Sequence, residues 1–296
     1  MPELPEVETI RRGLQEAITN KKIADFVDLD KKFVRIKKEN VLGRRIVDIL
    51  RRAKILIFVL DDDSSLIIHL KMTGQLIWES CEGEKEFCLK KRKRVVGGHP
   101  SEEMFEKLPT KHTRAIFKFV DGSVLYFNDL RRFGYIKKSD FCDFDKILEV
   151  SKLGPEPLDQ NSNFSALYLI NQSKRFKNRT IKQFILDQEI IAGVGNIYSD
   201  EALFYGGIVP TKKVSEVTKA EWERLFLAIK KALNLGIKYG GSSEDTFVNA
   251  FGERGKMTDY TKVYRKEGKR CPICGGEIKK IKLGGRGTHY CPRCRK

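Results

Sequence analysis

The sequence predicts an α+β protein with more than one domain, and three observations lead to this fold class. Short strand patterns fill the first half of the 296-residue chain, helical patterns fill the second half, and paired cysteines stand near the carboxyl end. A chain of this length can bury a sizeable core, and it is long enough for two domains and a small metal-bound third.

The first predicted element is a helix over residues 5–17. Val7, Ile10 and Leu14 fall on one face at helical spacing, and Pro5 suits the first turn of a helix. An amphipathic helix therefore opens the chain.

The strands follow this helix. Apolar runs cover residues 55–60 and 66–70, and Asp121-Gly122 is a strong signal for a two-residue hairpin turn. Many short strands with tight turns are typical of a sandwich or a barrel. The polar stretch over 79–111 contains the basic run 90–94, which is either a solvated loop or a contact for a DNA backbone.

The second half is predicted to be helical after a hinge at residues 154–157. Thr180 and Gln183 have the spacing of a capping box, as do Thr218 and Glu221, so helices should start at both places. No internal repeat is visible.

Between these two helix starts, Gly193-x-Gly195-Asn196 predicts a tight turn into a helix capped by Asn196. Such a turn aims backbone N–H groups at a phosphate. A dinucleotide-binding loop is the alternative, but the third glycine and the βαβ context of that motif are absent from the sequence.

Four cysteines have the Cys-x2-Cys spacing of a structural zinc site: Cys271, Cys274, Cys291 and Cys294. Four thiolates fill a tetrahedral zinc ion and leave no position open, so one structural Zn²⁺ is predicted. Residues 278–290 between the pairs should form a hairpin with its tip at 284–287.

The charge of the chain points to a polyanionic partner. Lys and Arg number 57 against 40 Asp and Glu, which gives a net charge of +17 and a pI near 9.5. Residues 262–296 carry twelve basic and two acidic side chains. A basic surface that only confers solubility is the alternative.

The sequence also predicts a soluble, reducing compartment. No apolar run approaches the roughly 20 residues of a bilayer span, and the acidic amino terminus is unlike a secretory signal. The other three cysteines are scattered. We expect a cytoplasmic protein.

The amino terminus carries a candidate nucleophile. Removal of Met1 before the small residue Pro2 would leave a secondary amine, which can attack a sugar carbon and form an iminium (Schiff base). Glu3 could act as the acid–base partner, and Glu6 could orient this corner. A plain lead-in to the helix is the alternative.

Seven motifs occur in the order that is found in bacterial formamidopyrimidine-DNA glycosylases, and together they cover nearly the whole chain. They are Met1–Leu14, Arg51–Lys54, His69–Gly74, Asp129–Gly134, Leu153–Leu158, Asp187-Gln188 together with Gly193–Tyr198, and the terminal cysteines. The chain closely resembles this family.

The resemblance implies an amino-terminal β-sandwich, a helix–two-turns–helix domain and a zinc hairpin. The implied boundaries are 1–141 for the sandwich, 142–160 for a linker, 161–261 for the helical domain and 262–296 for the zinc finger.

It also implies an enzyme of base excision repair that removes 8-oxoguanine and formamidopyrimidines and then cleaves the strand by β,δ-elimination. Pro2 would be the nucleophile and Glu3 the acid–base group. Lys54 would transfer a proton in β-elimination, and Arg286 would bind phosphate and assist δ-elimination.

The implied partner is damaged double-stranded DNA, bound by a monomer associated with the nucleoid. Met72, Arg131 and Phe133 would fill the gap left by a flipped base. The remaining implied DNA contacts are His69, His112, Lys177 and Asn196.

Some positions depart from the family pattern. Leu130 replaces the usual proline before Arg131, which puts the rigidity of that loop in doubt, Lys71 stands where glycine is commoner, and Arg114 where histidine is frequent. The stretch 79–111 is longer than usual, and a loop over 242–261 should close on the flipped base.

Two other functions stay open. A relative that acts on oxidised pyrimidines would share the amine and the zinc site, although that branch usually has glycine where this chain has Leu4. A zinc-hairpin protein without enzymatic activity would bind DNA with a strong salt dependence and leave the strand intact.

Overall fold

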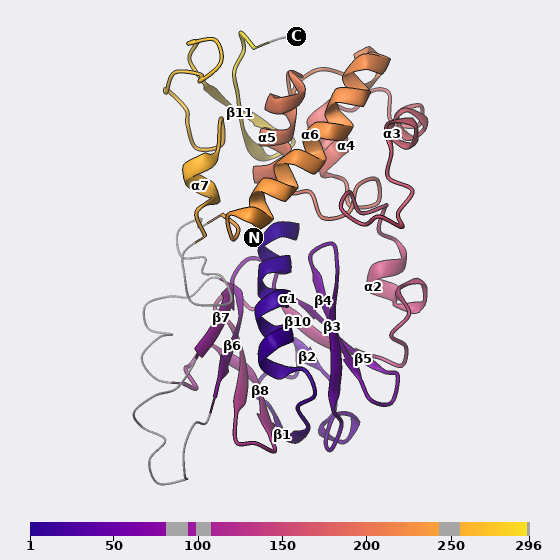
Figure 1. Cartoon of the computed structure of the whole chain (residues 1–296), viewed down its shortest axis with the longest axis vertical. Helices are drawn as coiled ribbons and strands as arrows, with labels where there is room; N and C mark the ends of the chain where they lie inside the picture. The colour runs from indigo at the N-terminus through magenta and orange to yellow at the C-terminus, as the bar shows by residue number, and fades with distance from the viewer. Residues whose placement is uncertain (81–93, 99–107, 243–254, 295–296) are drawn as a thin grey trace. The chain divides into compact units, whose positions relative to one another are not determined.

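The computed structural model describes residues 1–80, 94–98, 108–242 and 255–294 and divides into two compact units (Figure 1). The amino-terminal unit comprises Met1–Ser151 and Gly240–Gly255, and the carboxyl-terminal unit comprises Lys152–Tyr239 and Lys256–Lys296. Residues 90–93 of the basic run 90–94 and most of the expected lesion-closing loop lie outside the described residues.

The amino-terminal unit begins with helix α1 (Leu4–Ile18), as the periodicity predicts. Its apolar stripe, which includes Val7, Ile10 and Leu14, is almost completely buried. The helix packs against strands β3, β4 and β7. This burial stabilises the helix far more than its intrinsic propensity could.

Two five-stranded sheets form the rest of this unit. The first has the order β1-β8-β9-β6-β7 and the second β2-β10-β5-β4-β3. Neighbouring strands are antiparallel except β2 and β10. The strands are β1 (Ile23–Asp28), β2 (Val34–Arg35), β3 (Ile46–Arg52), β4 (Ile55–Leu60), β5 (Ser65–His69), β6 (Gly74–Glu79), β7 (Arg94–Gly98), β8 (Thr113–Phe119), β9 (Val124–Asp129) and β10 (Tyr135–Ser139).

Apolar side chains from both sheets and from α1 share one core, which identifies the predicted β-rich half as a sandwich. Strand β4 is buried along its whole length, which explains its unbroken apolar run. The hairpin β8–β9 turns at Asp121-Gly122, where Gly122 has a φ of +82°. The turn signal in the sequence is therefore confirmed.

The carboxyl-terminal unit is mainly helical. Its helices are α3 (Ala166–Ser173), α4 (Ile181–Leu186), α5 (Asn196–Gly206), α6 (Lys219–Lys238) and α7 (Met257–Tyr260); the short helix α2 (Leu148–Ser151) belongs to the other unit. Helices α4 and α6 start at the two predicted capping boxes. Helices α5 and α6 pack closely, since a Cβ built on Gly236 would lie 2.5 Å from Tyr198.

The zinc hairpin consists of β11 (Lys279–Leu283) and β12 (Arg286–Tyr290). Its turn is narrower than the expected tip over 284–287, because Gly284 and Gly285 alone make it, both with positive φ. Arg286 is instead the first residue of β12, paired with Leu283. Among the helices of the described residues, none combines the length and apolarity needed to cross a membrane.

Candidate functional site

Pro2 and Glu3 stand immediately before α1, and both are buried. The Glu6 carboxylate organises this corner. One of its oxygens accepts the Glu3 N–H at 2.9 Å, and the other accepts the Ser242 N–H at 2.7 Å. Glu6 therefore ties the predicted nucleophile end of the chain to the segment that enters the 242–261 loop.

Lys54 lies in the turn between β3 and β4 and is only 6% exposed. The preceding Ala53 has a φ of +54°, a conformation that residues with a Cβ rarely adopt. Arg51 supports the turn, since its Nη1 donates to the Ala53 carbonyl at 3.1 Å and its Nε donates to Glu8 at 2.9 Å. Because Glu8 is on α1, this chain of contacts joins the Lys54 turn to the helix that follows Pro2.

Glu8 accepts hydrogen bonds from three arginines: Arg11, Arg12 and Arg51. Burial alone would raise the pKa of the Glu8 carboxyl, but these hydrogen bonds outweigh it and lower the pKa to about 2. Glu8 is thus a fixed anion, which the sequence reasoning missed.

His69, at the end of β5, is a neutral histidine. Burial, followed by the charges of Lys71 and Lys54, lowers the pKa of His69 to about 3. Its Nδ1 accepts the Lys71 N–H at 3.0 Å, so a proton on the ring belongs on Nε2. His69 can offer an N–H donor without adding charge.

Met72, Arg131 and Phe133 come together at one end of the first sheet, where β6 begins and β9 ends. Met72 is 38% and Phe133 52% exposed, so both apolar side chains are accessible to a partner. The Arg131 guanidinium lies 4.8 Å from the centre of the Phe133 ring. His112 is at the same end, because its carbonyl accepts the Asp129 N–H at 2.9 Å.

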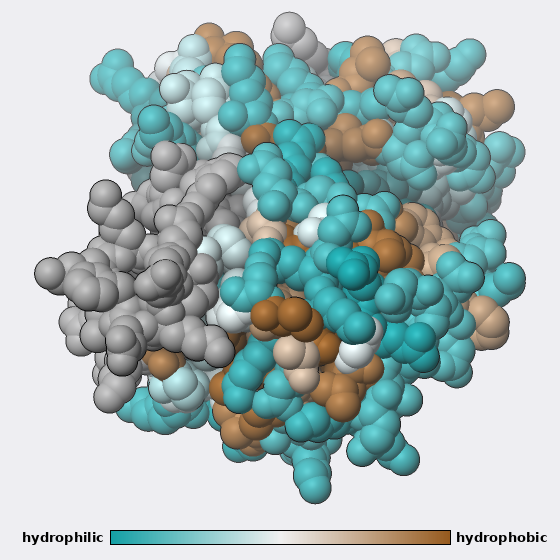
Figure 2. Space-filling view, turned by 60° about the horizontal axis from the view of Figure 1, so that its bottom comes forward, coloured by the Kyte–Doolittle hydropathy of each residue, from teal (hydrophilic) through white to brown (hydrophobic). Residues whose placement is uncertain are grey.

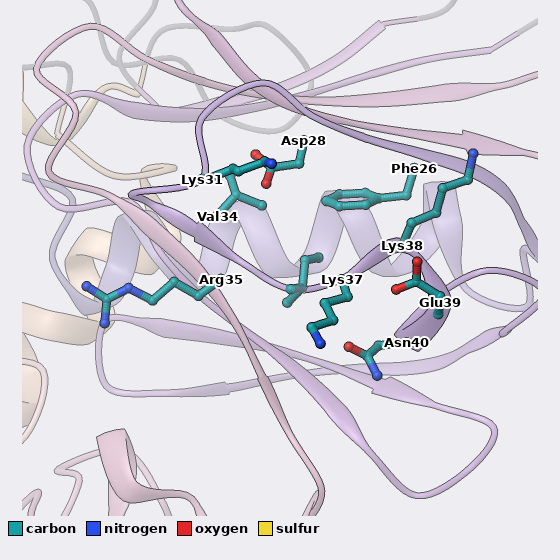
Figure 3. A pocket seen from close by; sticks show the side chains of 10 residues that line it. Phe26, Asp28, Lys31, Val34, Arg35, Lys37, Lys38, Glu39 and Asn40 are labelled. Atoms are coloured by element: carbon teal, nitrogen blue, oxygen red, sulfur yellow. The ribbon is translucent and has the colours of Figure 1, made fainter.

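A pocket of about 790 Å³ opens elsewhere in this unit, and none of the predicted site residues lines it. Figure 3 shows basic side chains around it, with Arg35 and Lys38 at opposite ends of the view. Lys38 is paired with Asp25 at 2.6 Å. Hydrophilic residues likewise dominate the molecular face seen in Figure 2, in keeping with the charge of the chain.

In the carboxyl-terminal unit, Asn196 contacts the strand that carries Arg286. Asn196 Nδ2 donates to the carbonyl of Gly287, the neighbour of Arg286, at 3.0 Å. The expectation that Asn196 caps α5 is wrong, because Gly195 is the N-cap and Asn196 the first helical residue. The Asn196 side chain is used to hold the zinc hairpin instead.

A network of buried charged residues adjoins this contact, and no periodic pattern in the sequence predicts it. Lys182 on α4 pairs with Asp200 on α5, and both side chains are fully buried. The second Asp200 oxygen accepts the backbone N–H of His289 at 2.9 Å. Three separate elements therefore meet at one carboxylate.

The next residue on α5, Glu201, organises the segment that leads to the zinc site. Its carboxylate accepts the backbone N–H groups of Lys262, Val263 and Tyr264, each within 3.0 Å. Burial raises the pKa of Glu201, although these three hydrogen bonds oppose that effect.

Lys177 is exposed and lines a pocket of about 400 Å³ with Lys174 and Trp222. Neither Asn196 nor Arg286 lines this pocket. The pocket therefore provides no contact between Lys177 and those two residues.

The four cysteine sulfurs lie within 4.8 Å of one another, and two of the Sγ–Sγ distances, Cys271–Cys294 and Cys274–Cys291, are 3.4 Å. A tetrahedral zinc ion with Zn–S bonds of about 2.3 Å separates its sulfurs by about 3.8 Å. The cluster fits one structural zinc ion.

Comparison with known families gives three matches in chain order. Residues 1–136 match the formamidopyrimidine-DNA glycosylase N-terminal domain, 153–248 the formamidopyrimidine-DNA glycosylase H2TH domain, and 268–296 the zinc finger found in FPG and IleRS.

Individual relatives agree over their full length. The formamidopyrimidine-DNA glycosylase of Pelotomaculum thermopropionicum is 36% identical over 100% of this chain and 99% of its own, and that of Shouchella clausii is 37% identical over 99% of each. Lactococcus lactis Fpg, solved in complex with DNA containing an abasic site, has a TM-score of 0.82 and 33% identity with full coverage of both chains. The Thermus thermophilus MutM (Fpg) structure gives 0.81 and 34%, over 99% and 98%. The chain therefore belongs to the formamidopyrimidine-DNA glycosylase family.

Proposed function

We propose that the protein is a bifunctional DNA glycosylase and abasic-site lyase that excises oxidised purines, 8-oxoguanine and formamidopyrimidines, in base excision repair. The observation that carries the proposal is the buried Pro2-Glu3 pair immediately before α1. The same helix carries Glu8, which accepts a hydrogen bond from the arginine that supports the Lys54 turn. A nucleophile, an acid–base group and an ammonium thereby belong to one connected part of the molecule. Family membership supports this assignment.

The substrate would be damaged duplex DNA; the similar Lactococcus lactis protein was solved with DNA that contains an abasic site. The net charge of +17 favours a polyanion, and Asn196 and Arg286 together offer a site for a phosphate. A base inside a duplex is out of reach, so the damaged nucleotide is flipped out. The exposed Met72, Arg131 and Phe133 then fill the gap. His69, His112 and Lys177 remain proposed DNA contacts.

The first chemical step needs Met1 to be removed, which frees the nitrogen of Pro2. This nitrogen attacks C1′ of the deoxyribose, and the bond from C1′ to the base breaks with its electron pair leaving on the base. The departing base takes the proton that the nitrogen loses. Glu3 then protonates the ring oxygen O4′, the C1′–O4′ bond opens, and the nitrogen lone pair completes an iminium.

Strand cleavage follows from the iminium. Loss of a C2′ proton supplies the electron pair that expels the 3′ phosphate, and a second proton loss expels the 5′ phosphate in the same way. Lys54 is proposed to move the proton in the first elimination, and Arg286 to bind the phosphate in the second. Water then hydrolyses the imine and restores Pro2. Zinc, held by four thiolates, would keep the hairpin that bears Arg286 folded and take no part in bond breaking.

Borohydride trapping tests the nucleophile. Incubation with an 8-oxoguanine duplex and borohydride should give a covalent adduct, and digestion followed by mass spectrometry should place the DNA on the peptide that starts at Pro2. A Pro2→Leu variant keeps Met1, because aminopeptidases act before small residues, and it should trap at least about 100-fold less. An adduct on any other peptide would overturn the assignment.

A lesion panel tests the substrate. Excision of 8-oxoguanine should be much faster than excision of thymine glycol; the reverse order would indicate the branch that acts on oxidised pyrimidines. Binding to damaged duplex without any strand break would indicate a zinc-finger protein that only binds DNA.

Two further measurements test the partner and the location. Sedimentation of the protein with its duplex should give a complex that contains one protein chain. The protein should also co-purify with the nucleoid of lysed cells.

A further inference from the structure

Two short loops carry the three exposed residues at the end of the first sheet, and they are far apart in sequence. Met72 lies in the turn that joins β5 to β6, and Arg131 and Phe133 lie in the turn that follows β9. In the sheet, Gly74 pairs with Asp129, so the two turns start from neighbouring strands. An element that pushes into a base stack must hold its side chains firmly, because a loose wedge would be displaced by the returning base.

The Asp129 carboxylate is the centre of this region, and it is 1% exposed. Its Oδ2 accepts the N–H groups of Phe133 at 2.8 Å and Gly134 at 2.7 Å, while its Oδ1 accepts the Arg131 N–H at 3.2 Å. A single side chain therefore fixes three backbone donors in the loop that presents Arg131 and Phe133.

The same carboxylate reaches the other loop through Thr73. The Thr73 hydroxyl donates to Asp129 Oδ1, and its oxygen accepts the Arg131 N–H at 2.9 Å. Thr73 is the immediate neighbour of Met72. The hydroxyl thus joins the Met72 turn to the Arg131 loop across 58 residues of sequence.

The backbone in both loops is held in unusual conformations. Lys71 has a φ of +51° and Arg132 a φ of +57°, which each cost energy for a residue with a Cβ and persist only where the surroundings impose them. Arg132 is also anchored, because its guanidinium contacts Asp30 at 2.6 Å.

We infer that Asp129 and Thr73 are positioning residues that lock the Met72 and Arg131–Phe133 loops into one rigid wedge. This inference rests on the proposed function, since it assigns the two residues to the opening of the duplex. Neither residue is among the groups that are proposed to touch the reacting atoms. They act through the backbone that presents the wedge.

The test compares two substrates, of which only one needs a wedge. A duplex with 8-oxoguanine requires the stack to be opened, whereas an abasic site in a single strand has no stack and requires only the lyase chemistry. Thr73→Val removes the hydroxyl and keeps the shape of the side chain. It should slow single-turnover excision from the duplex about tenfold and change cleavage of the single-stranded abasic site less than about twofold.

Thr73→Ser restores the hydroxyl and should restore duplex excision to within about twofold of wild type. Asp129→Asn, which replaces one acceptor oxygen by a donor amide, should slow duplex excision more than Thr73→Val does. Fluorescence of 2-aminopurine beside the lesion should report slower unstacking with Thr73→Val and Asp129→Asn than with the wild-type protein. Asp121→Asn serves as the matched control, because Asp121 also caps a turn of the same hairpin β8–β9, at its other end.

Equal losses on both substrates, or a Thr73→Val variant as fast as wild type on the duplex, would overturn the inference. So would an Asp121→Asn variant with the same selective defect. Failure of the proposed function looks different, because the wild-type protein would then not excise 8-oxoguanine at all. Circular dichroism of Thr73→Val and Thr73→Ser guards against a folding defect, and the abasic-site rate provides a second check on the folded fraction.

Discussion

Two antiparallel hairpins each present an arginine that we assign to DNA, but they are stabilised in different ways. Hairpin β8–β9 contributes Phe117 and Phe127 to the large apolar core of the sandwich, and Arg131 follows it. Hairpin β11–β12 exposes most of β11, and it depends on the four cysteines and on contacts to α5 for its position. A core holds the first hairpin; a metal and a few polar contacts hold the second.

Loss of zinc should therefore have the largest effect on stability, and this effect should be confined to hairpin β11–β12. Structural zinc sites contribute about 10–16 kcal/mol in small domains, so Cys291→Ser should abolish amide exchange protection in β11–β12 and leave β8–β9 protected. Hydrogen exchange with mass spectrometry measures both hairpins in one experiment. Cys142→Ser, which changes a free cysteine, should leave both unchanged. Retained protection of β11–β12 in the Cys291 variant would show that the metal is dispensable.

Disruption of the buried Lys182–Asp200 pair should have the second-largest effect on stability. Lys182→Met leaves the Asp200 carboxylate buried without its cation, which should lower the unfolding free energy by about 3–5 kcal/mol. Urea unfolding followed by tryptophan fluorescence in a Trp78→Phe background reports on Trp222, in the carboxyl-terminal unit. The double variant Lys182→Met/Asp200→Asn should recover much of the loss, because no unpaired charge remains and the amide oxygen can still accept the His289 N–H. A double variant as unstable as the single one would contradict this reasoning.

Glu8 allows a similar test of a charged residue in the amino-terminal unit, and its contribution to stability should depend on pH. The pKa of Glu8 falls from 4.5 to about 2 on folding, so its stabilisation is present above about pH 4.5 and is lost as the pH falls toward 2. Glu8→Gln should cost about 2 kcal/mol at pH 7, after allowance for solvent screening, and progressively less in acid. Glu16→Gln, on the exposed side of the same helix, should show neither effect.

Arg286→Ala should have the smallest effect on folding and a specific effect on function. Arg286 is exposed, so the hairpin should keep its exchange protection. Loss of one phosphate contact should reduce the slope of log affinity against log salt by about 1. Cleavage products should stop at β-elimination. Lys282→Ala, which removes another exposed cation of the hairpin, should leave δ-elimination intact; if it does not, the role of Arg286 is not specific.

Much of the fold could be predicted because it depends on local pattern. The apolar run of β4, the turn at Asp121-Gly122 and the capping box at Thr180 all act over a few residues, and the structure confirms each of them. The zinc ligands were equally visible, because each Cys-x2-Cys pair is local.

The parts that were missed depend on contacts between distant residues. Asp129 lies within a recognised motif, yet its link to Thr73 spans 56 residues, and the Lys182–Asp200 contact depends on how α4 packs on α5. Asparagine is a preferred cap, so the sequence predicts that Asn196 caps its helix; in the structure Gly195 is the cap, and the Asn196 amide nitrogen donates to a carbonyl of the zinc hairpin. The roles of the individual site residues remain predictions that the experiments above test.

The close contact of α6 with Tyr198 limits how this protein can be made more heat-tolerant. Replacement of glycine by alanine inside a helix is a standard way to stabilise a protein, and it commonly raises the free energy of unfolding by about 1 kcal/mol. At Gly236 the new methyl group would lie 2.5 Å from the Tyr198 ring and would push α5, which begins with Asn196, away from its neighbour. Gly236 should therefore be kept in any stability design, because Gly236→Ala would lower the melting temperature and displace the helix that carries the proposed phosphate contact Asn196.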